Sequence, residues 1–206
     1  MHTTTAQKTE QLIQGIAENG FAVIEHFLPP ATIATLASEA KKLQEIGEMH
    51  RAGTGQNSAA KPDDSIRGDF IHWLDEAEIS PTQQEYLRRM EELRENLNRN
   101  FYLGLFDIES HFAIYPPGAI YRKHLDQFQE NNHRQVSCIL YLNETWQHEN
   151  GGQLRLYLDG QEPTSYLDFE PTGGTMVTFL SGRFYHEVLP AHHERLSLTG
   201  WFRTRE

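Results

Sequence analysis

The second half of the chain, from residue 108 onward, is divided into short strand-like runs by turn sequences, and this pattern most restricts the possible folds. The separators include PPG, ENGG, DGQEP, PTGG and SGR. The runs are rich in β-branched and aromatic residues, which favour strands; they lie at 111–115, 119–125, 135–142, 153–158, 165–169, 175–180, 184–189 and 196–202. Many short strands separated by turns indicate a sandwich or barrel.

The first half carries the signals of helices. Threonines at positions 3–5 supply hydroxyls for an N-cap, and Gly20 suits the left-handed end of that helix. Pro29 and Pro30 open a second helix, and Ser80 caps a third. The apolar residues of the third helix recur at helical spacing: Tyr86, Leu87, Met90, Leu93, Leu97 and Phe101. We also expect strands at 21–27 and 65–74.

Together these signals predict a mostly β fold with flanking helices, a double-stranded β-helix (jelly roll) with about three N-terminal supporting helices. The length of 206 residues suggests a single domain, 1–206. Residues 1–107 would supply the helical support and residues 108–206 the jelly-roll core. The one cysteine, Cys138, falls in a predicted buried strand, so we expect it to contribute packing.

The segment 51–64 contains Gly, Ala, Ser and Asn but almost no bulky apolar residue. Such a segment cannot anchor itself in a core, so we expect a mobile loop. It is either a plain connector or a lid over a site.

The charge of the chain excludes some classes of partner. Its 18 Lys and Arg against 29 Asp and Glu give a net charge of −11. This is the wrong sign for binding nucleic acid or an anionic membrane. No apolar run reaches the roughly 20 residues that cross a bilayer, and the first residues lack the pattern of a secretion signal. We therefore expect a soluble, cytoplasmic protein.

Three residues suggest a metal site. His124 and Asp126 lie two positions apart at a predicted strand end, where alternate side chains face the same way. Such a pair often arises by chance. His186 follows several strands later and could complete two histidines and a carboxylate, the facial triad of non-haem Fe(II) oxygenases. A catalytic zinc hydrolase with the same ligand set stays open.

Arg195 separates these two interpretations. It lies at the start of the next predicted strand after His186. An oxygenase that uses 2-oxoglutarate needs a fixed cation for the far carboxylate of that co-substrate, and the planar arginine fork grips a carboxylate through two hydrogen bonds. A zinc hydrolase has no such need, although Arg195 as an ordinary surface cation is the simpler alternative.

Several segments resemble the prolyl-hydroxylase family that modifies hypoxia-inducible factor, and most of all its short bacterial members. The likeness spans about residues 66–203. The segments that carry it are IRGDFIHW (66–73), AIYPPGAIYRKHLD (113–126), RQVSCILYLN (134–143), ENGGQLRLY (149–157) and FYHEVLPAHHERLSLTGW (184–201).

This resemblance implies roles for individual residues. His124, Asp126 and His186 would bind iron, and Arg195 would anchor 2-oxoglutarate. The remaining pocket residues it implies are Tyr141 and Tyr115 beside the far carboxylate, Leu154 and Val188 as apolar walls, Thr199 as a polar contact near the anchor, and Trp201 as a wall beside the iron. The turn after Tyr115 is one residue shorter than in the family, and plain core packing is the alternative for Leu154 and Val188.

The resemblance also changes the interpretation of the 51–64 loop. Asp69 and Trp73 match residues beside the family's substrate-binding finger, so a clamp over a protein substrate becomes the better interpretation of this loop. Arg67 would pair with a carboxylate there or be solvated.

The function implied by the resemblance is a dioxygenase that depends on Fe(II), 2-oxoglutarate and O2, with ascorbate as a further cofactor. It would hydroxylate a prolyl residue of a protein, with elongation factor Tu as the suspected partner, release succinate and CO2, and serve oxygen sensing. Two alternatives remain: the same chemistry on another residue or a small molecule, and a non-catalytic jelly-roll metal-binding or sensor module.

Overall fold

The computed structural model describes residues 4–53, 63–75, 77–127, 132–160 and 164–205. Within them the expected three helices form: α1 (Thr5–Asn19), α2 (Pro30–Glu45) and α3 (Pro81–Phe101). Thr4 and Ser80 close capping boxes at the starts of α1 and α3, and Gly20 ends α1 in a left-handed conformation (φ 83°). A short 3-10 helix, η1 (His148–Asn150), lies between two strands.

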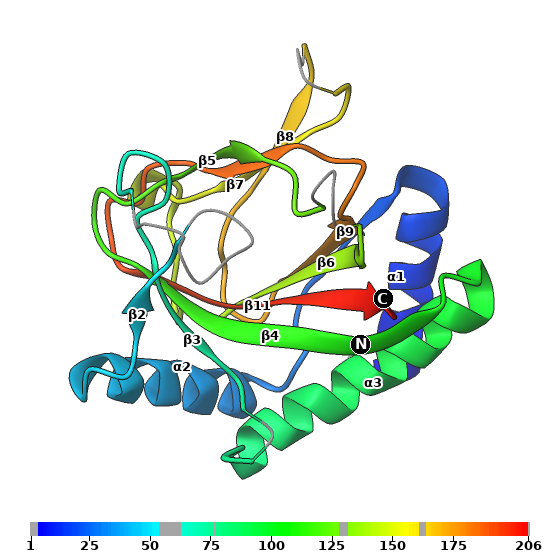
Figure 1. Ribbon diagram of the computed structural model, residues 1–206, viewed down its shortest axis with the longest axis horizontal. Coiled ribbons are helices and arrows are strands. Elements are labelled where there is room, and N and C mark those ends of the chain that lie inside the picture. Colours follow the sequence, from blue (N-terminus) through cyan, green and yellow to red (C-terminus); the bar gives the residue numbers. More distant parts are fainter. Residues whose placement is uncertain (1–3, 54–62, 76, 128–131, 161–163, 206) are drawn as a thin grey trace.

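The strands form two antiparallel sheets, seen one above the other in Figure 1. The larger has the order β1-β9-β6-β11-β4-β3-β2 and the smaller β5-β10-β7-β8. The strands are β1 (Phe21–Ile24), β2 (His50–Arg51), β3 (Phe70–Trp73), β4 (Leu105–Tyr115), β5 (Tyr121–His124), β6 (Arg134–Tyr141), β7 (Leu154–Tyr157), β8 (Tyr166–Phe169), β9 (Met176–Leu180), β10 (His186–Val188) and β11 (Arg195–Thr204). Strands β4 to β11 correspond to the predicted runs, which confirms the mostly β fold.

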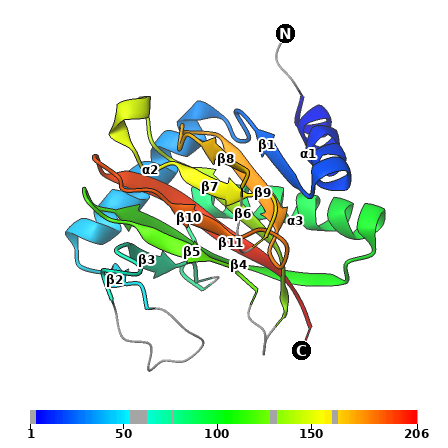
Figure 2. The ribbon, with the colours of Figure 1, turned by 90° about the horizontal axis from the view of Figure 1, so that it is seen from above.

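The helices cover the outer face of the larger sheet, and the smaller sheet faces its inner side (Figures 1 and 2). Successive side chains of β6 point alternately toward the helices and toward the smaller sheet. Val136, Cys138 and Leu140 belong to the core shared with the helices, whereas Ile139 and Tyr141 pack between the sheets. Residues with inward side chains on the larger sheet can therefore line a space between the two layers.

The two strands predicted in the first half of the chain are shorter than expected. The strand predicted at 21–27 ends at Ile24, because the chain turns at His26, which takes a left-handed conformation (φ 52°). The strand predicted at 65–74 is reduced to β3, preceded by a turn and an isolated bridge between Arg67 and Tyr121.

Most of the predicted loop 51–64, namely 54–62, lies outside the described residues. Its first residue, Arg51, ends β2, which pairs with β3. Among the helices of the described residues, none has the length and apolar character needed to cross a membrane.

Candidate active site

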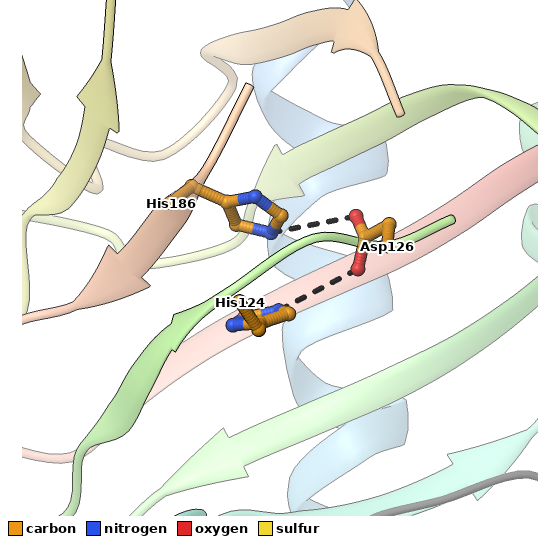
Figure 3. A group of neighbouring side chains, drawn as sticks. All are labelled: His124, Asp126 and His186. Carbon is orange, nitrogen blue, oxygen red and sulfur yellow. Dashed lines mark ion pairs between the residues drawn. The ribbon is translucent and has the colours of Figure 1, made fainter. Parts of the chain in front are cut away.

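His124, Asp126 and His186 lie together between the two sheets (Figure 3). His124 ends β5 and His186 begins β10, and these two residues face each other across the strand pair. Asp126 lies in the bend after β5. Its Oδ1 is 3.5 Å from Nε2 of His124, and its Oδ2 is 3.4 Å from Nε2 of His186. The ligand atoms of all three lie within 4.8 Å of one another, close enough to hold one metal ion.

Backbone carbonyls orient both imidazoles. Nδ1 of His124 donates to the carbonyl of Arg122 (2.7 Å), and Nδ1 of His186 donates to that of Phe184 (3.1 Å). With the proton on Nδ1, the lone pair of each Nε2 faces Asp126 and is available to a metal. Burial and the neighbouring His124 lower the pKa of His186 to about 4, against the opposing charge of Asp126. His186 is therefore neutral at pH 7, which is the form that binds metals.

Asp126 supplies the anionic ligand. Burial alone would raise the pKa of this carboxyl, but His186 and His124 outweigh it and hold the pKa below its ordinary value. The buried Ser137 hydroxyl donates to Oδ2 at 2.7 Å. Two imidazoles and an ionised carboxylate, with no thiolate, fit Fe(II) in a facial triad.

Arg195 lies at the other end of the same space. Its side chain is buried (1% exposed), and its Nε donates to the carbonyl of Gly152 at 2.9 Å. The guanidinium lies 4.9 Å from the ring centroid of Tyr115 and 5.1 Å from that of Tyr141. No carboxylate in the described part of the chain forms an ion pair with Arg195. Since buried charges are normally paired, this guanidinium suits an anionic ligand.

Tyr141 adds a second unused group beside Arg195. Its hydroxyl is buried and has no hydrogen-bond partner among the described residues. Burial raises the pKa of this phenol to about 12, although Arg195 opposes the shift, so the hydroxyl stays protonated as a donor. A buried guanidinium and a free buried donor fit the far carboxylate of 2-oxoglutarate.

A cavity of about 390 Å³, its open mouth included, joins the two ends. Most of the pocket residues predicted from the sequence line it: Tyr115, Leu154, Val188, Thr199 and Trp201, together with the three triad residues and Arg195. Tyr141 is not among the lining residues; its ring packs against Arg195.

Arg67 and Asp69, predicted beside the substrate loop, form a buried ion pair with each other. Nε and Nη2 of Arg67 donate to the two oxygens of Asp69 at 2.6 and 2.9 Å, and Asp69 is 1% exposed. Arg67 also lines the cavity, with its guanidinium 4.5 Å from the ring centroid of Tyr121. Arg67 is thus paired and not solvated. Trp73 is 44% exposed and packs edge-on against His111.

Replacing Asp69 with alanine should destabilise the protein by about 3–5 kcal/mol, because it leaves the Arg67 guanidinium largely buried and unpaired. Urea unfolding measures the loss. Asp168→Ala, which breaks the more exposed pair with Arg155, should cost only about 0–1 kcal/mol. Equal losses in the two variants would contradict a structural role for the Arg67–Asp69 pair.

Sequence reasoning missed several cavity residues. The ring of Tyr121 stacks on His124 at 3.6 Å, and His111 packs against Trp201 at 5.4 Å. Ser137 was also missed. A signal for it existed, since it is a small polar residue inside the otherwise apolar run VSCILYL. Tyr121 gave no signal distinct from an ordinary strand residue.

The buried His111 should make stability depend on pH. Burial, assisted by Arg67, lowers its pKa from 6.5 to about 4. Between these values the unfolded chain binds a proton that the folded chain does not, so stability falls as the pH falls from about 6.5 toward 4. In metal-free protein, His111→Leu should reduce the loss of unfolding free energy between pH 7 and 5 by about 2 kcal/mol. Denaturant titrations at both pH values measure this. The exposed His193→Leu serves as control, and equal losses in all three proteins would refute the prediction.

Comparison with known proteins identifies the family. Residues 110–203 match the model of the 2OG-Fe(II) oxygenase superfamily. A solved prolyl-4-hydroxylase from Pseudomonas putida is 44% identical, with a TM-score of 0.85 over 96% of this chain and 100% of that one. The chain belongs to the prolyl-hydroxylase family of 2OG-Fe(II) oxygenases. The resemblance noted in the sequence is thereby confirmed.

Two animal members of this prolyl-hydroxylase family are also similar. Human Egl nine homolog 1 is 30% identical over 203 residues, which cover 94% of this chain but only 46% of the human protein. The chain therefore spans less than half the length of that relative. The Trichoplax adhaerens prolyl hydroxylase, solved with a peptide of the hypoxia-inducible factor oxygen degradation domain, is 26% identical with a TM-score of 0.85, over 97% of this chain and 90% of that one.

Proposed function

We propose that this protein is an Fe(II)- and 2-oxoglutarate-dependent dioxygenase that hydroxylates a prolyl residue of a protein substrate, with release of succinate and CO2. His124, Asp126 and His186 would hold the iron, and Arg195 and Tyr141 would bind the far carboxylate of 2-oxoglutarate. Iron and 2-oxoglutarate, when bound, supply the activation of O2 that side chains cannot perform. One observation carries the proposal: a buried, uncompensated guanidinium shares a cavity with two histidines and a carboxylate.

The side chains of this cavity suit the task in charge and polarity. The single carboxylate of the triad only partly balances the charge of a divalent cation, which leaves the cation attractive to an anionic keto acid. The wall between the triad and Arg195 includes Leu154 and Val188, both buried and apolar, which keep water from the bound co-substrate. The Tyr115 ring lies against the guanidinium of Arg195 and restricts its position.

A prolyl substrate is supported by the relatives. The Pseudomonas putida protein is named a prolyl-4-hydroxylase, and the Trichoplax adhaerens prolyl hydroxylase was solved with a peptide fragment of hypoxia-inducible factor. We extend this activity to the present chain, with elongation factor Tu as the candidate substrate, ascorbate as the supporting reductant and oxygen sensing as the cellular role. The exposed Trp73, at the end of β3 beside the cavity residue His111, offers a surface to a protein substrate.

The test is a reconstitution with Fe(II), 2-oxoglutarate, ascorbate and purified elongation factor Tu. Succinate release and mass spectrometry of the partner are measured together, and we expect the gain of one oxygen on a prolyl residue. Turnover of 2-oxoglutarate with another residue or a small molecule as acceptor would replace the prolyl assignment. Absence of turnover with every acceptor would contradict the enzyme proposal and favour a metal-binding or sensor module.

The Tyr141 hydroxyl can be tested by measuring two quantities, the KM for 2-oxoglutarate and the Tm, which should respond differently to its removal. Tyr141→Phe should raise the KM for 2-oxoglutarate about 2- to 10-fold, the value of one hydrogen bond, without lowering the Tm, because the hydroxyl has no hydrogen-bond partner among the described residues. The matched control is Tyr86→Phe, which breaks a buried bond to Ser110 (3.2 Å) away from the cavity. That variant should lose about 1 kcal/mol of stability and keep its KM. A lowered Tm with unchanged KM in Tyr141→Phe would remove Tyr141 from co-substrate binding.

A further inference from the structure

Two serine hydroxyls stand behind the candidate ligand Asp126. Ser137 on β6 donates to Oδ2 of Asp126 at 2.7 Å, and its oxygen lies 2.8 Å from Oγ of Ser181, which directly follows β9. Both serines are 0% exposed. Neither belongs to the ligand set or touches the Arg195 end of the cavity, so the proposed function does not yet account for them.

The direction of these hydrogen bonds follows from counting protons. An ionised carboxylate only accepts, so the single hydroxyl proton of Ser137 goes to Asp126. The bond between the two serines must then be donated by Ser181. The result is a one-way chain, from Ser181 to Ser137 to Oδ2, in which each bond polarises the next.

Backbone hydrogen bonds fix the position of Ser181, the first donor in this series of hydrogen bonds. The amide of Ser181 donates to the carbonyl of Gln135 at 3.0 Å, which ties the residue after β9 to the beginning of β6. Ser137 itself is held within the larger sheet, paired with Phe179 on one side and Trp201 on the other. Asp126, in contrast, lies in a bend outside any strand. The hydrogen bond from Ser137 therefore ties the Asp126 carboxylate to the larger sheet, whereas the backbone around Asp126 itself is not held in a strand.

We propose that Ser137, supported by Ser181, is a positioning residue that fixes the Asp126 carboxylate for metal binding. This inference rests on the proposed function, since it requires a metal at the triad. A hydrogen bond also withdraws charge from the carboxylate, so ligand basicity alone would predict tighter metal binding without Ser137. Orientation predicts the opposite, a loss of 10- to 100-fold in affinity when a partner behind a ligand is removed.

The test compares variants of equal shape. Ser137→Thr keeps the hydroxyl and Ser137→Val replaces it with a methyl group, so packing changes are shared by both. The dissociation constant for Mn(II), a redox-stable substitute for Fe(II), is measured from the free-ion EPR signal without 2-oxoglutarate or substrate. We expect the valine variant to bind Mn(II) at least about 10-fold more weakly than the threonine variant. Ser181→Ala, one step removed from the ligand, should show a smaller loss.

The control is Ser110→Ala, which removes another buried serine hydroxyl that bonds Tyr86 on the helix side of the larger sheet. Its affinity for Mn(II) should equal that of the parent protein. Equal or tighter binding by Ser137→Val relative to Ser137→Thr would overturn the positioning role. Failure of the parent protein itself to bind Mn(II) or Fe(II) would instead overturn the proposed function, so the two failures are distinguishable.

Discussion

Asp126→Ala is expected to lower 2-oxoglutarate turnover by more than about 100-fold, since loss of a group behind a ligand already costs 10–100-fold and Asp126 is the ligand itself. It is the only anionic group of the candidate triad. His186→Ala should have the same effect, because it also removes one of the three candidate ligand atoms. Succinate release with Fe(II) present is the measurement.

Both variants should remain folded, which separates a chemical from a structural loss. Asp126 lies in a bend, and its removal strands no charge, because the adjacent His186 is neutral at pH 7. Circular dichroism and Tm should resemble those of the parent. Asp107→Ala is a control near the start of β4, at a carboxylate that does not line the cavity and pairs with Arg203; it should turn over normally. Normal turnover by Asp126→Ala would refute the metal assignment.

Arg195→Lys is expected to raise the KM for 2-oxoglutarate by about 10- to 100-fold. Lysine cannot form the bidentate hydrogen bonds of arginine, so one charge-assisted hydrogen bond of about 1.5–3 kcal/mol is lost. Lysine keeps the positive charge, so the change tests geometry and not charge alone. It also removes the Nε donor to the Gly152 carbonyl. Steady-state kinetics with varied 2-oxoglutarate measure the effect.

A co-substrate analogue that lacks the far carboxylate tests directly whether Arg195 binds this group. In 2-oxovalerate a methyl group replaces the far carboxylate, so it cannot use Arg195. The parent protein should strongly prefer 2-oxoglutarate to this analogue, and Arg195→Lys should lose most of that preference. Arg155→Lys, at a surface pair with Asp168, should keep it. An unchanged preference in Arg195→Lys would show that the far carboxylate binds elsewhere.

Local patterns predicted the elements well because each pattern had a local cause. The caps at Ser80 and Gly20 and the turn sequences between strands act within a few residues, and the helices and strands β4 to β11 form where they indicate. The early end of β1 could not be predicted, because it depends on a turn at His26 tied to Gly174, far along the chain, by the bond from Phe27.

The residues of the candidate site could be predicted where their role allows only a few residue types, as for metal ligands and a carboxylate-binding cation. Two histidines, a carboxylate and an arginine indicated the site by their chemistry, and the structure brings His124, Asp126, His186 and Arg195 to one cavity. The supporting contacts were not predictable. Whether Arg67 pairs or is solvated depends on its exact distance from Asp69, and whether Ser137 reaches Asp126 depends on strand register.

The proposed function depends on one metal ion between two imidazoles and a carboxylate. Anomalous diffraction at the iron edge, from crystals grown without oxygen in Fe(II), tests this directly. We expect a single strong peak bounded by Nε2 of His124, Nε2 of His186 and the carboxylate of Asp126. No peak there, or a peak held by other residues, would contradict it.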